Sequence, residues 1–336
     1  MKIKQIVRFN TWWNFILPPL LAFIYLFLLL FDIHWAEALF ITGLFLVWMI
    51  GAASFGYFVN DLCDVKMDAL ADKKNETHQL SIPVKIVIIA LSLGIAFTPW
   101  VLLSDSIFVF GLVIFHLILL VIYSAPPIRL KKTMYLGMIC DTLYSILIPL
   151  LIVIATFSGI HENPPLFILS GTILLWSFLK GFRNILLHQL DDKKNDAKAG
   201  HYTFVHKIGP VRVLNCINFF ILPFEFIVLS FLCVYLSFEI DFFFIGFGIF
   251  LVFTFLKFNL WKIFSIRPRQ LKFRFLYFLN DFYEEWLPII ALIFLALHKL
   301  EFVIFLVLHI LLFPQKIVKL YGTITQKKAI FNKLWK

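Results

Sequence analysis

Four polar residues at the end of the second apolar run have a spacing that suits metal binding. Asn60, Asp64 and Asp68 are four residues apart, and Asp61 lies beside them. Each residue of a helix advances by about 100°, so the four side chains would fall within an arc of about 100°. Carboxylates on one face repel each other unless a cation lies between them, and oxygen ligands suit Mg²⁺ shared with phosphates. We therefore expect the three aspartates to bind metal; an ordinary solvated loop is the alternative.

A second polar group follows the sixth apolar run. Steps of four residues back from Asp196 give Asp192, His188, Asn184 and Lys180. A helix would align them in one stripe that enters the apolar run. Polar side chains at membrane depth are costly and usually face a cavity or a partner. This second cluster predicts two further metal ligands, Asp192 and Asp196, and three contacts to a diphosphate, Lys180, Asn184 and His188.

Cations accompany both clusters. The segment Tyr123–Lys132 contains a Pro–Pro turn followed by Arg129 and Lys131, and an arginine suits bidentate phosphate binding. We expect Arg129 and Lys131, together with Asn60, to contact the same diphosphate; marking of membrane topology is the alternative for both cations. Arg183 lies off the second stripe, and two interpretations stay open for it, a pair with a neighbouring helix or a contact to phosphate.

The elements that position these residues are membrane helices. Apolar residues make up 61% of the 336 residues and charged residues only 15%, which is unlike a soluble domain. The net charge of +10 does not indicate nucleic acid, because the basic residues lie in short segments between apolar runs. Runs of about 20 apolar residues predict spans, and the candidates are 13–31, 36–58, 83–103, 106–123, 135–157, 165–187, 211–236, 240–261 and a long final stretch, 275–313.

The connections between these runs alternate in charge. Segments 32–35, 104–105, 158–164 and 237–239 contain no Lys or Arg, whereas the N-terminus and segments 59–82, 124–134, 188–210 and 262–274 are basic. Basic loops favour the cytoplasmic side. We therefore predict an integral, multi-pass membrane protein whose N-terminus and active-site loops are cytoplasmic.

The end of the chain is compatible with one more crossing. Nine spans would place the C-terminus outside, yet Lys316, Lys319, Lys327, Lys328, Lys333 and Lys336 favour the inside. The polar break from His298 to Glu301 would resolve this as a turn before a short last segment. We predict a single domain over 1–336, an all-α bundle of nine spans with a short tenth segment and a central cavity that opens toward the cytoplasm.

These motifs resemble those of the UbiA family of intramembrane prenyltransferases. The family motif Asn-x-x-x-Asp-x-x-x-Asp is matched by Asn60, Asp64 and Asp68, and its second motif, Asp-x-x-x-Asp, by Asp192 and Asp196. The resemblance covers about residues 8–212. Further matches are Tyr123 through Lys131 for a Tyr-Ser-x-Pro-Pro-x-Arg-Leu-Lys segment, Ala199, Gly200, Thr203 and Gly209 for the pattern after the second motif, and the positions of Asp141 and Asn14.

Two positions depart from the family pattern. Many members carry Tyr-x-x-x-Lys just before the second aspartate pair, with the lysine near the diphosphate, and here those positions are Asn184 and His188. Three alternatives are open for the missing lysine. Lys180, one turn deeper, supplies the cation, a protonated His188 supplies it, or no residue replaces it. The stretch Asn280–Trp286 has no family counterpart that we can assign; it is either a structural cap or a wall of the acceptor pocket.

The resemblance implies Mg²⁺-dependent transfer of a prenyl group from an isoprenoid diphosphate to an apolar or amphipathic acceptor within the lipid bilayer. Asp68 or Asp191 would take up the acceptor's proton. A secondary transporter, a phosphatidyl-transferring enzyme and a non-catalytic family member remain alternatives. The sequence determines neither the acceptor, the prenyl chain length nor the oligomeric state.

Overall fold

The computed structural model describes residues 7–70, 75–103, 106–160, 166–198, 200, 203–257 and 274–316. All regular structure within these ranges is helical. The chain divides into two compact units, one of residues 1–20 and 36–232 and the other of residues 21–35 and 233–336. The predicted single domain over 1–336 stays a prediction. Most of the predicted basic segment 262–274, Ala199 and the lysines beyond Lys316 lie outside the described residues.

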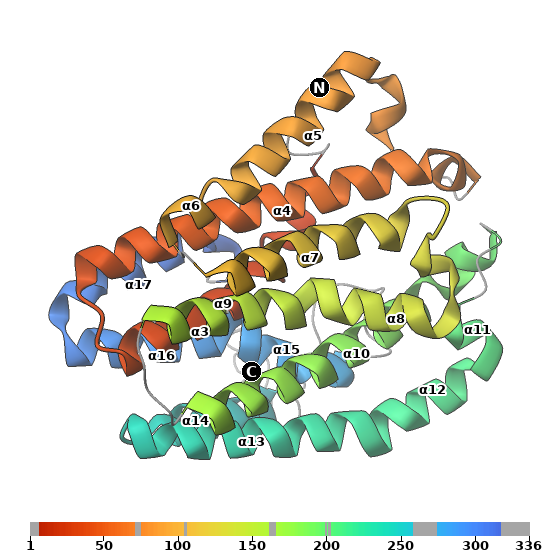
Figure 1. The fold of residues 1–336 in the computed structure, drawn as a ribbon. Helices are drawn as coiled ribbons and strands as arrows, with labels where there is room; N and C mark the ends of the chain where they lie inside the picture. The colour runs from red at the N-terminus through yellow and green to blue at the C-terminus, as the bar shows by residue number, and fades with distance from the viewer. Residues whose placement is uncertain are drawn as a thin grey trace, which may run out of the picture. The chain divides into compact units, whose positions relative to one another are not determined.

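The first unit contains long helices joined by short connections (Figure 1). After α2 (Phe9–Trp12) and the start of α3 (Leu17–Leu30), α4 runs over Trp35–Leu70 and α10 over Leu166–Lys198, so both predicted polar stripes lie on continuous helices. The other helices are α5 (Ile82–Phe97), α6 (Trp100–Leu103), α7 (Ile107–Ser124), α8 (Met134–Thr142), α9 (Ile148–Ile160), α11 (Phe204–Ile208), α12 (Pro210–Cys216) and the first part of α13 (Leu222–Glu239).

Five helical segments among the described residues are long and apolar enough to cross a membrane. They are Trp35–Leu70, Ile82–Leu103, Ile107–Ser124, Met134–Gly159 and Pro210–Glu239. The chain therefore has the multi-helical membrane character that the apolar runs predict. The number of nine crossings, the tenth segment, the central cavity and the orientation stay predictions.

The second unit ends in two apolar helices joined by a polar turn. α16 (Leu287–His298) is followed by the 3₁₀ turn η9 (Leu300–Phe302) and by α17 (Val303–Leu312), so the predicted break at His298–Glu301 is confirmed. Lys299 Nζ lies 2.6 Å from Asp32 Oδ1, and the hydrogen bond from Lys299 lowers the pKa of Asp32. Its remaining helices are α14 (Phe243–Phe255), η7 (Arg274–Tyr277) and α15 (Phe278–Asp281).

Three π-helical turns interrupt the long helices, each in the same relation to a proline. They are η3 (Leu143–Leu147), η4 (Ile217–Ile221) and η8 (Phe282–Trp286). The second residue after each turn is Pro149, Pro223 or Pro288, respectively. A proline ring clashes with the carbonyl four residues earlier in an α-helix. The wider π turn removes that clash and shifts the register of the side chains that follow.

Close helix packing in the first unit depends on small residues. A Cβ atom on Gly51 of α4 would lie 2.3 Å from the backbone nitrogen of Ala96 in α5. A Cβ atom on Gly56 would lie 2.7 Å from a methyl group of Leu120 in α7. Glycine at these two positions therefore lets α5 and α7 approach α4 directly.

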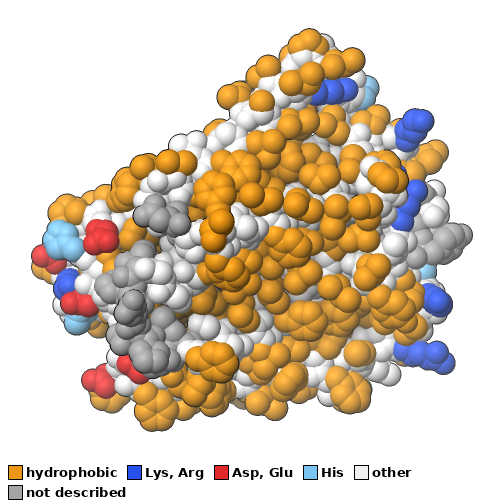
Figure 2. Space-filling model, viewed as in Figure 1, with side chains coloured by type: hydrophobic (Ala, Val, Ile, Leu, Met, Phe, Trp, Pro, Cys, Tyr) orange, Lys and Arg blue, Asp and Glu red, His pale blue; other side chains and the backbone are white. Residues whose placement is uncertain are grey.

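The surface of the first unit separates apolar and basic side chains. Figure 2 shows a broad hydrophobic surface over α5, α7 and α9, with Lys and Arg side chains at the edge where α4 and α10 end. The exposed basic residues at this end are Lys66, Lys132, Lys194, Lys198, Lys207 and Arg212. This distribution fits helices in lipid with one basic end in water.

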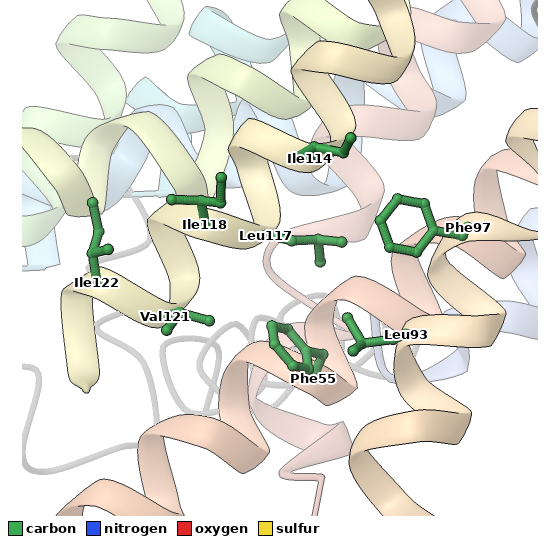
Figure 3. A pocket seen from close by; sticks show the side chains of 8 residues that line it. All are labelled: Phe55, Leu93, Phe97, Ile114, Leu117, Ile118, Val121 and Ile122. Atoms are coloured by element: carbon green, nitrogen blue, oxygen red, sulfur yellow. The ribbon is translucent and has the colours of Figure 1, made fainter. Parts of the chain in front are cut away.

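An apolar groove of about 280 Å³ indents the hydrophobic surface between α4, α5 and α7. In Figure 3, Phe55 of α4 forms its floor, and Leu93 and Phe97 of α5 face five side chains of α7. Ile114 and Ile118, on the α7 side, are more than two-fifths exposed. All eight lining side chains are apolar, as expected of a wall that contacts lipid chains.

Candidate active site

The site is built at the end of the first unit where α4, α7 and α10 terminate (Figure 1). α4 continues two residues beyond Asp68, which confirms that Asn60, Asp61, Asp64 and Asp68 lie on one helix. Asp61 and Asp68 are buried, whereas Asn60 and Asp64 are partly exposed. The predicted first cluster is therefore present as one helical face.

Asp64 is held by the two cations that follow the Pro–Pro turn. Arg129 donates from a terminal nitrogen to Asp64 Oδ1 at 2.7 Å, and Lys131 Nζ lies 2.6 Å from both carboxylate oxygens. Arg129 has a φ of 42°, a left-handed conformation that is rare for a residue with a side chain. This bend in the connection directs both cations at α4.

Asn60 ties the same connection to α7. Its Oδ1 accepts hydrogen bonds from the hydroxyl of Ser124 and from Lys131 Nζ, each at 2.9 Å. Burial lowers the pKa of Lys131, and the Asp64 carboxylate opposes that shift. Asn60, Arg129 and Lys131, the three residues predicted to share one anion, therefore lie together at Asp64.

Two residues that the sequence interpretation did not consider complete the first cluster. Arg8 pairs with Asp61, with a terminal nitrogen 2.6 Å from Oδ1, and lies 3.9 Å from Asp68 Oδ2. Asn75 donates to the backbone carbonyl of Asp61 and to Asp68 Oδ2, both at 2.8 Å. Arg8 is 53 residues from Asp61 in the sequence, and Asn75 lies beyond the end of α4, so helical periodicity predicts neither contact.

The second cluster lies on the exposed end of α10. His188 Nδ1 is 3.6 Å from Asp192 Oδ2, and Asn195 donates to Asp192 Oδ1 at 3.4 Å. Asp196 and Asn184 are partly exposed, and Asp191 is exposed on another side of the helix. The predicted stripe is thus continuous and open to solvent at its aspartate end.

The segment after α10 folds back onto it, and the motif residues there have structural roles. Thr203 and His206 form a capping box at the start of α11, and His206 Nε2 donates to the carbonyl of Lys193 at 2.9 Å. Gly200 and Gly209 have φ values of 70° and 93°, which favour glycine. This part of the pattern positions the end of α10.

Arg183 and Lys180 are buried side by side on α10 but have different surroundings. Arg183 makes two contacts to Glu225 of α13, at 2.5 Å and 2.9 Å, and both side chains are fully buried. Of the two interpretations left open, the pair with a neighbouring helix is the one that the structure shows. Lys180 Nζ lies 5.9 Å from the centre of the Trp176 ring, a distance that suits a cation–π contact.

A third acidic position lies on α8. Asp141 accepts a hydrogen bond of 2.6 Å from the hydroxyl of Tyr144, whose ring centre is 5.0 Å from that of Tyr123 in α7. The predicted first-span residue Asn14 is buried. All residues of the candidate site described so far belong to the first unit.

Comparison with known proteins decides the family. The model of the UbiA prenyltransferase family matches residues 16–281. This chain belongs to the UbiA prenyltransferase family. The lycopene elongase/hydratase of Haloferax volcanii is 31% identical over 181 residues, which are 51% of this chain and 54% of that relative. The chain thus aligns with about half the length of this curated relative.

Solved structures agree with the family. A UbiA homologue from Archaeoglobus fulgidus bound to GPP and Mg²⁺ has a TM-score of 0.60 and 17% identity, covering 88% of this chain and all of that one. The homologue bound to DMAPP and Mg²⁺ has a TM-score of 0.57 and 18% identity, covering 86% and 99%. At these identities the similarity shows the fold, so the predicted UbiA-like membrane fold is confirmed.

The donor set of the site fits Mg²⁺ held jointly with phosphates. Among the described residues, no three Asp, Glu, His or Cys side chains converge enough to hold a metal alone. Mg²⁺ commonly uses one or two carboxylates and completes its shell with water and substrate phosphates, which suits Asp64 and Asp192. Among the described residues, Arg129 Nε is buried and has no hydrogen-bond partner. Its N–H could therefore donate to a bound anion.

Proposed function

We propose that this UbiA family member transfers a prenyl group from an allylic isoprenoid diphosphate to an acceptor within the membrane, with Mg²⁺. The observation that carries this proposal is the contact of Arg129 and Lys131 with Asp64 at the end of α4. A diphosphate bound with Mg²⁺ requires carboxylates that bind the metal and cations that bind the phosphate oxygens. Asp64 with Arg129 and Lys131 supplies both. The relatives bound to GPP and DMAPP with Mg²⁺ support the same substrate class.

In this proposal the chain's residues have separate tasks. Mg²⁺, when bound, neutralises the charge that develops on the leaving diphosphate. Asp64 and Asp68 on α4, and Asp192 and Asp196 on α10, would hold it, with Asp61 kept in place by Arg8. Arg129 and Lys131 would turn from Asp64 to phosphate oxygens, which lie on the same side of α4. Lys180, Asn184 and His188 would contact the diphosphate from α10.

The acceptor is proposed only as a class. The relative from Haloferax volcanii has a name that refers to lycopene, an apolar polyene. The hydrophobic surface of the first unit would admit such a molecule from lipid. An apolar or amphipathic lipid acceptor is therefore favoured over a sugar phosphate. The basic residues at the site end support a cytoplasmic orientation.

The test measures Mg²⁺-dependent diphosphate release from GPP and DMAPP by purified protein in liposomes, with mass spectrometry of the lipid products. Asp64→Asn and Asp192→Asn should each lower release by about 100-fold or more, because each removes charge that binds the metal. Asp32→Asn is the matched control, since Asp32 is an exposed carboxylate away from the motifs. Release that needs no Mg²⁺, or that survives both site substitutions, would contradict the proposal.

The alternatives predict other results in the same assay. A transporter or a non-catalytic member would bind GPP without releasing diphosphate. A phosphatidyl-transferring enzyme would act on a CDP-activated lipid. The non-catalytic alternative is suggested by Asn184 and His188, which depart from the family pattern. The variant His188→Lys restores the lysine of that pattern, and its diphosphate release is compared with that of the unsubstituted protein.

A further inference from the structure

The carboxylate of Asp141 is bound by a tyrosine that packs against a second tyrosine. Tyr144, one turn further along the same helix, donates to Oδ1 at 2.6 Å. The rings of Tyr123 and Tyr144 are 5.0 Å apart at an angle of 63°. Tyr57 of α4 and His188 of α10 are near enough to Asp141 for a charge interaction with its carboxylate. We call Asp141 with the three tyrosines the phenol cluster.

The backbone is arranged to aim Tyr144 at this carboxylate. Tyr144 lies in the π turn η3, where the N–H of Ile148 bonds to the carbonyl of Leu143. In the same pattern, the carbonyl of Tyr144 would accept a hydrogen bond from the N–H of residue 149. That residue is a proline and has no N–H. His116 of α7 replaces it: its Nε2 donates to the Tyr144 carbonyl at 3.0 Å. His116 is thus a positioning residue for Tyr144.

The phenol cluster lies one helical turn deeper in the bundle than the diphosphate residues. Tyr57 precedes Asn60 by three residues and Asp61 by four, a separation of about one turn or 5 Å along α4. Tyr123 directly precedes Ser124, whose hydroxyl bonds to Asn60. An allylic diphosphate bound at Asn60 with its tail in the membrane would place its first carbon beside these side chains.

The side chains of the phenol cluster are not fully buried, whereas the residues on either side of Tyr57 are. Tyr57, Tyr123, Tyr144 and Asp141 are all partly exposed. On α4, Tyr57 lies between Gly56 and Phe58, which are both buried. A carboxylate here, held by the hydroxyl of Tyr144, is placed to meet the reacting carbon.

We propose that Asp141 is the proton acceptor of the transfer reaction, an inference that rests on the proposed function. The C1–O bond of the allylic diphosphate breaks and the diphosphate leaves with the electron pair. The acceptor bonds to C1, the proton that it loses passes to the Asp141 carboxylate, and water later removes that proton. The tyrosine ring faces and the carboxylate also stabilise the positive charge before the bond forms.

Two other carboxylates considered for this role are less suitably placed. Asp68 Oδ2 accepts a hydrogen bond from Asn75 and lies at the outer end of the first cluster. Asp191 is exposed on α10. Neither lies on the membrane side of Asn60, where the first carbon of the substrate would be.

The test needs no knowledge of the acceptor. In liposomes supplied with GPP and Mg²⁺ alone, the geranyl cation has two fates: capture by water gives an alcohol, and loss of a C–H proton to a base gives a triene hydrocarbon. A proton acceptor at Asp141 predicts a triene fraction from the unsubstituted protein, measured by gas chromatography and mass spectrometry. Asp141→Asn should lower the triene-to-alcohol ratio by about 100-fold, while diphosphate release changes less than the ratio does.

Two further readouts keep the proposal open to refutation. Thermal stabilisation by GPP with Mg²⁺ should be retained in Asp141→Asn and lost in Asp64→Asn. Tyr144→Phe keeps the carboxylate but removes one donor, so its product ratio should be intermediate, which covers the case in which Asp141→Asn does not fold. An unsubstituted protein that makes alcohol alone, or an Asp141→Asn protein with an unchanged ratio, would overturn the assignment. Absence of all diphosphate release from the unsubstituted protein would instead refute the proposed function.

Discussion

Replacing Glu225 with glutamine should destabilise the protein far more than replacing Glu225 and Arg183 together with apolar residues. The two side chains form a bidentate pair between α10 and α13, and both are fully buried. Glutamine keeps the size of the side chain but leaves the guanidinium of Arg183 as a buried charge without its counter-ion. Breaking a buried pair in this way costs about 3–5 kcal/mol.

The double substitution Arg183→Met with Glu225→Leu removes both charges. Replacement of a buried ion pair by apolar residues of similar volume is often neutral or stabilising by up to about 4 kcal/mol. A change of 1 kcal/mol shifts the melting temperature of a unit of this size by about 2–4 °C. Glu225→Gln should therefore lower the apparent melting temperature by about 6–20 °C, and the double variant should melt at or above the unsubstituted protein.

The assay is thermal unfolding in detergent followed by size-exclusion chromatography with fluorescence detection. Asp32→Asn is the control for loss of one carboxylate, because Asp32 pairs with Lys299 but its side chain is 64% exposed. Exposed pairs contribute about 1 kcal/mol or less, so this control should shift the melting temperature by only a few degrees. The reasoning would be refuted if Glu225→Gln melted with the control, or if the double variant were as unstable as the single one.

Three more predictions use other contacts of the first unit. Gly51→Ala should lower the free energy of unfolding by about 1–3 kcal/mol, because the added Cβ would meet the Ala96 backbone. Gly43 has open space around it, so Gly43→Ala should raise the same quantity by up to about 1 kcal/mol. Thermal unfolding of the two variants measures the difference. His116→Ala should cost about 1–3 kcal/mol by leaving the Tyr144 carbonyl without its donor, and unchanged stability would remove His116 from this role. EDTA should abolish both diphosphate release from GPP and the thermal stabilisation by GPP, and added Mg²⁺ should restore both; persistence of either after chelation would contradict the metal dependence.

Features set by helical spacing were predictable from the sequence. The aspartates at steps of four remain on one face because α4 and α10 continue as helices beyond their apolar portions, to Leu70 and Lys198. The break at His298–Glu301 was also predictable, because consecutive polar residues cannot remain in an apolar run without cost. Both kinds of feature depend on nearest neighbours along the chain.

Long-range partners were not predictable in the same way. Arg8 reaches Asp61 across 53 residues, and nothing in the basic N-terminal segment distinguishes it from a residue that marks topology. For Arg129, a carboxylate and a phosphate are equally good partners by chemistry, so the sequence could assign it an anion but not choose between Asp64 and a substrate. Arg183 shows the same ambiguity, which Glu225 resolves.

The π turns were visible in the sequence only as prolines. Pro149, Pro223 and Pro288 lie inside apolar runs, and a kink is the usual expectation for such a residue. In η3 the extra residue does more than bend the helix, because the carbonyl left without a partner by Pro149 is the one that His116 binds. That contact fixes Tyr144, and Tyr144 fixes the carboxylate of Asp141. A proline thus links the packing of α7 against η3 to the geometry of the phenol cluster, one turn below the residues that would bind the diphosphate.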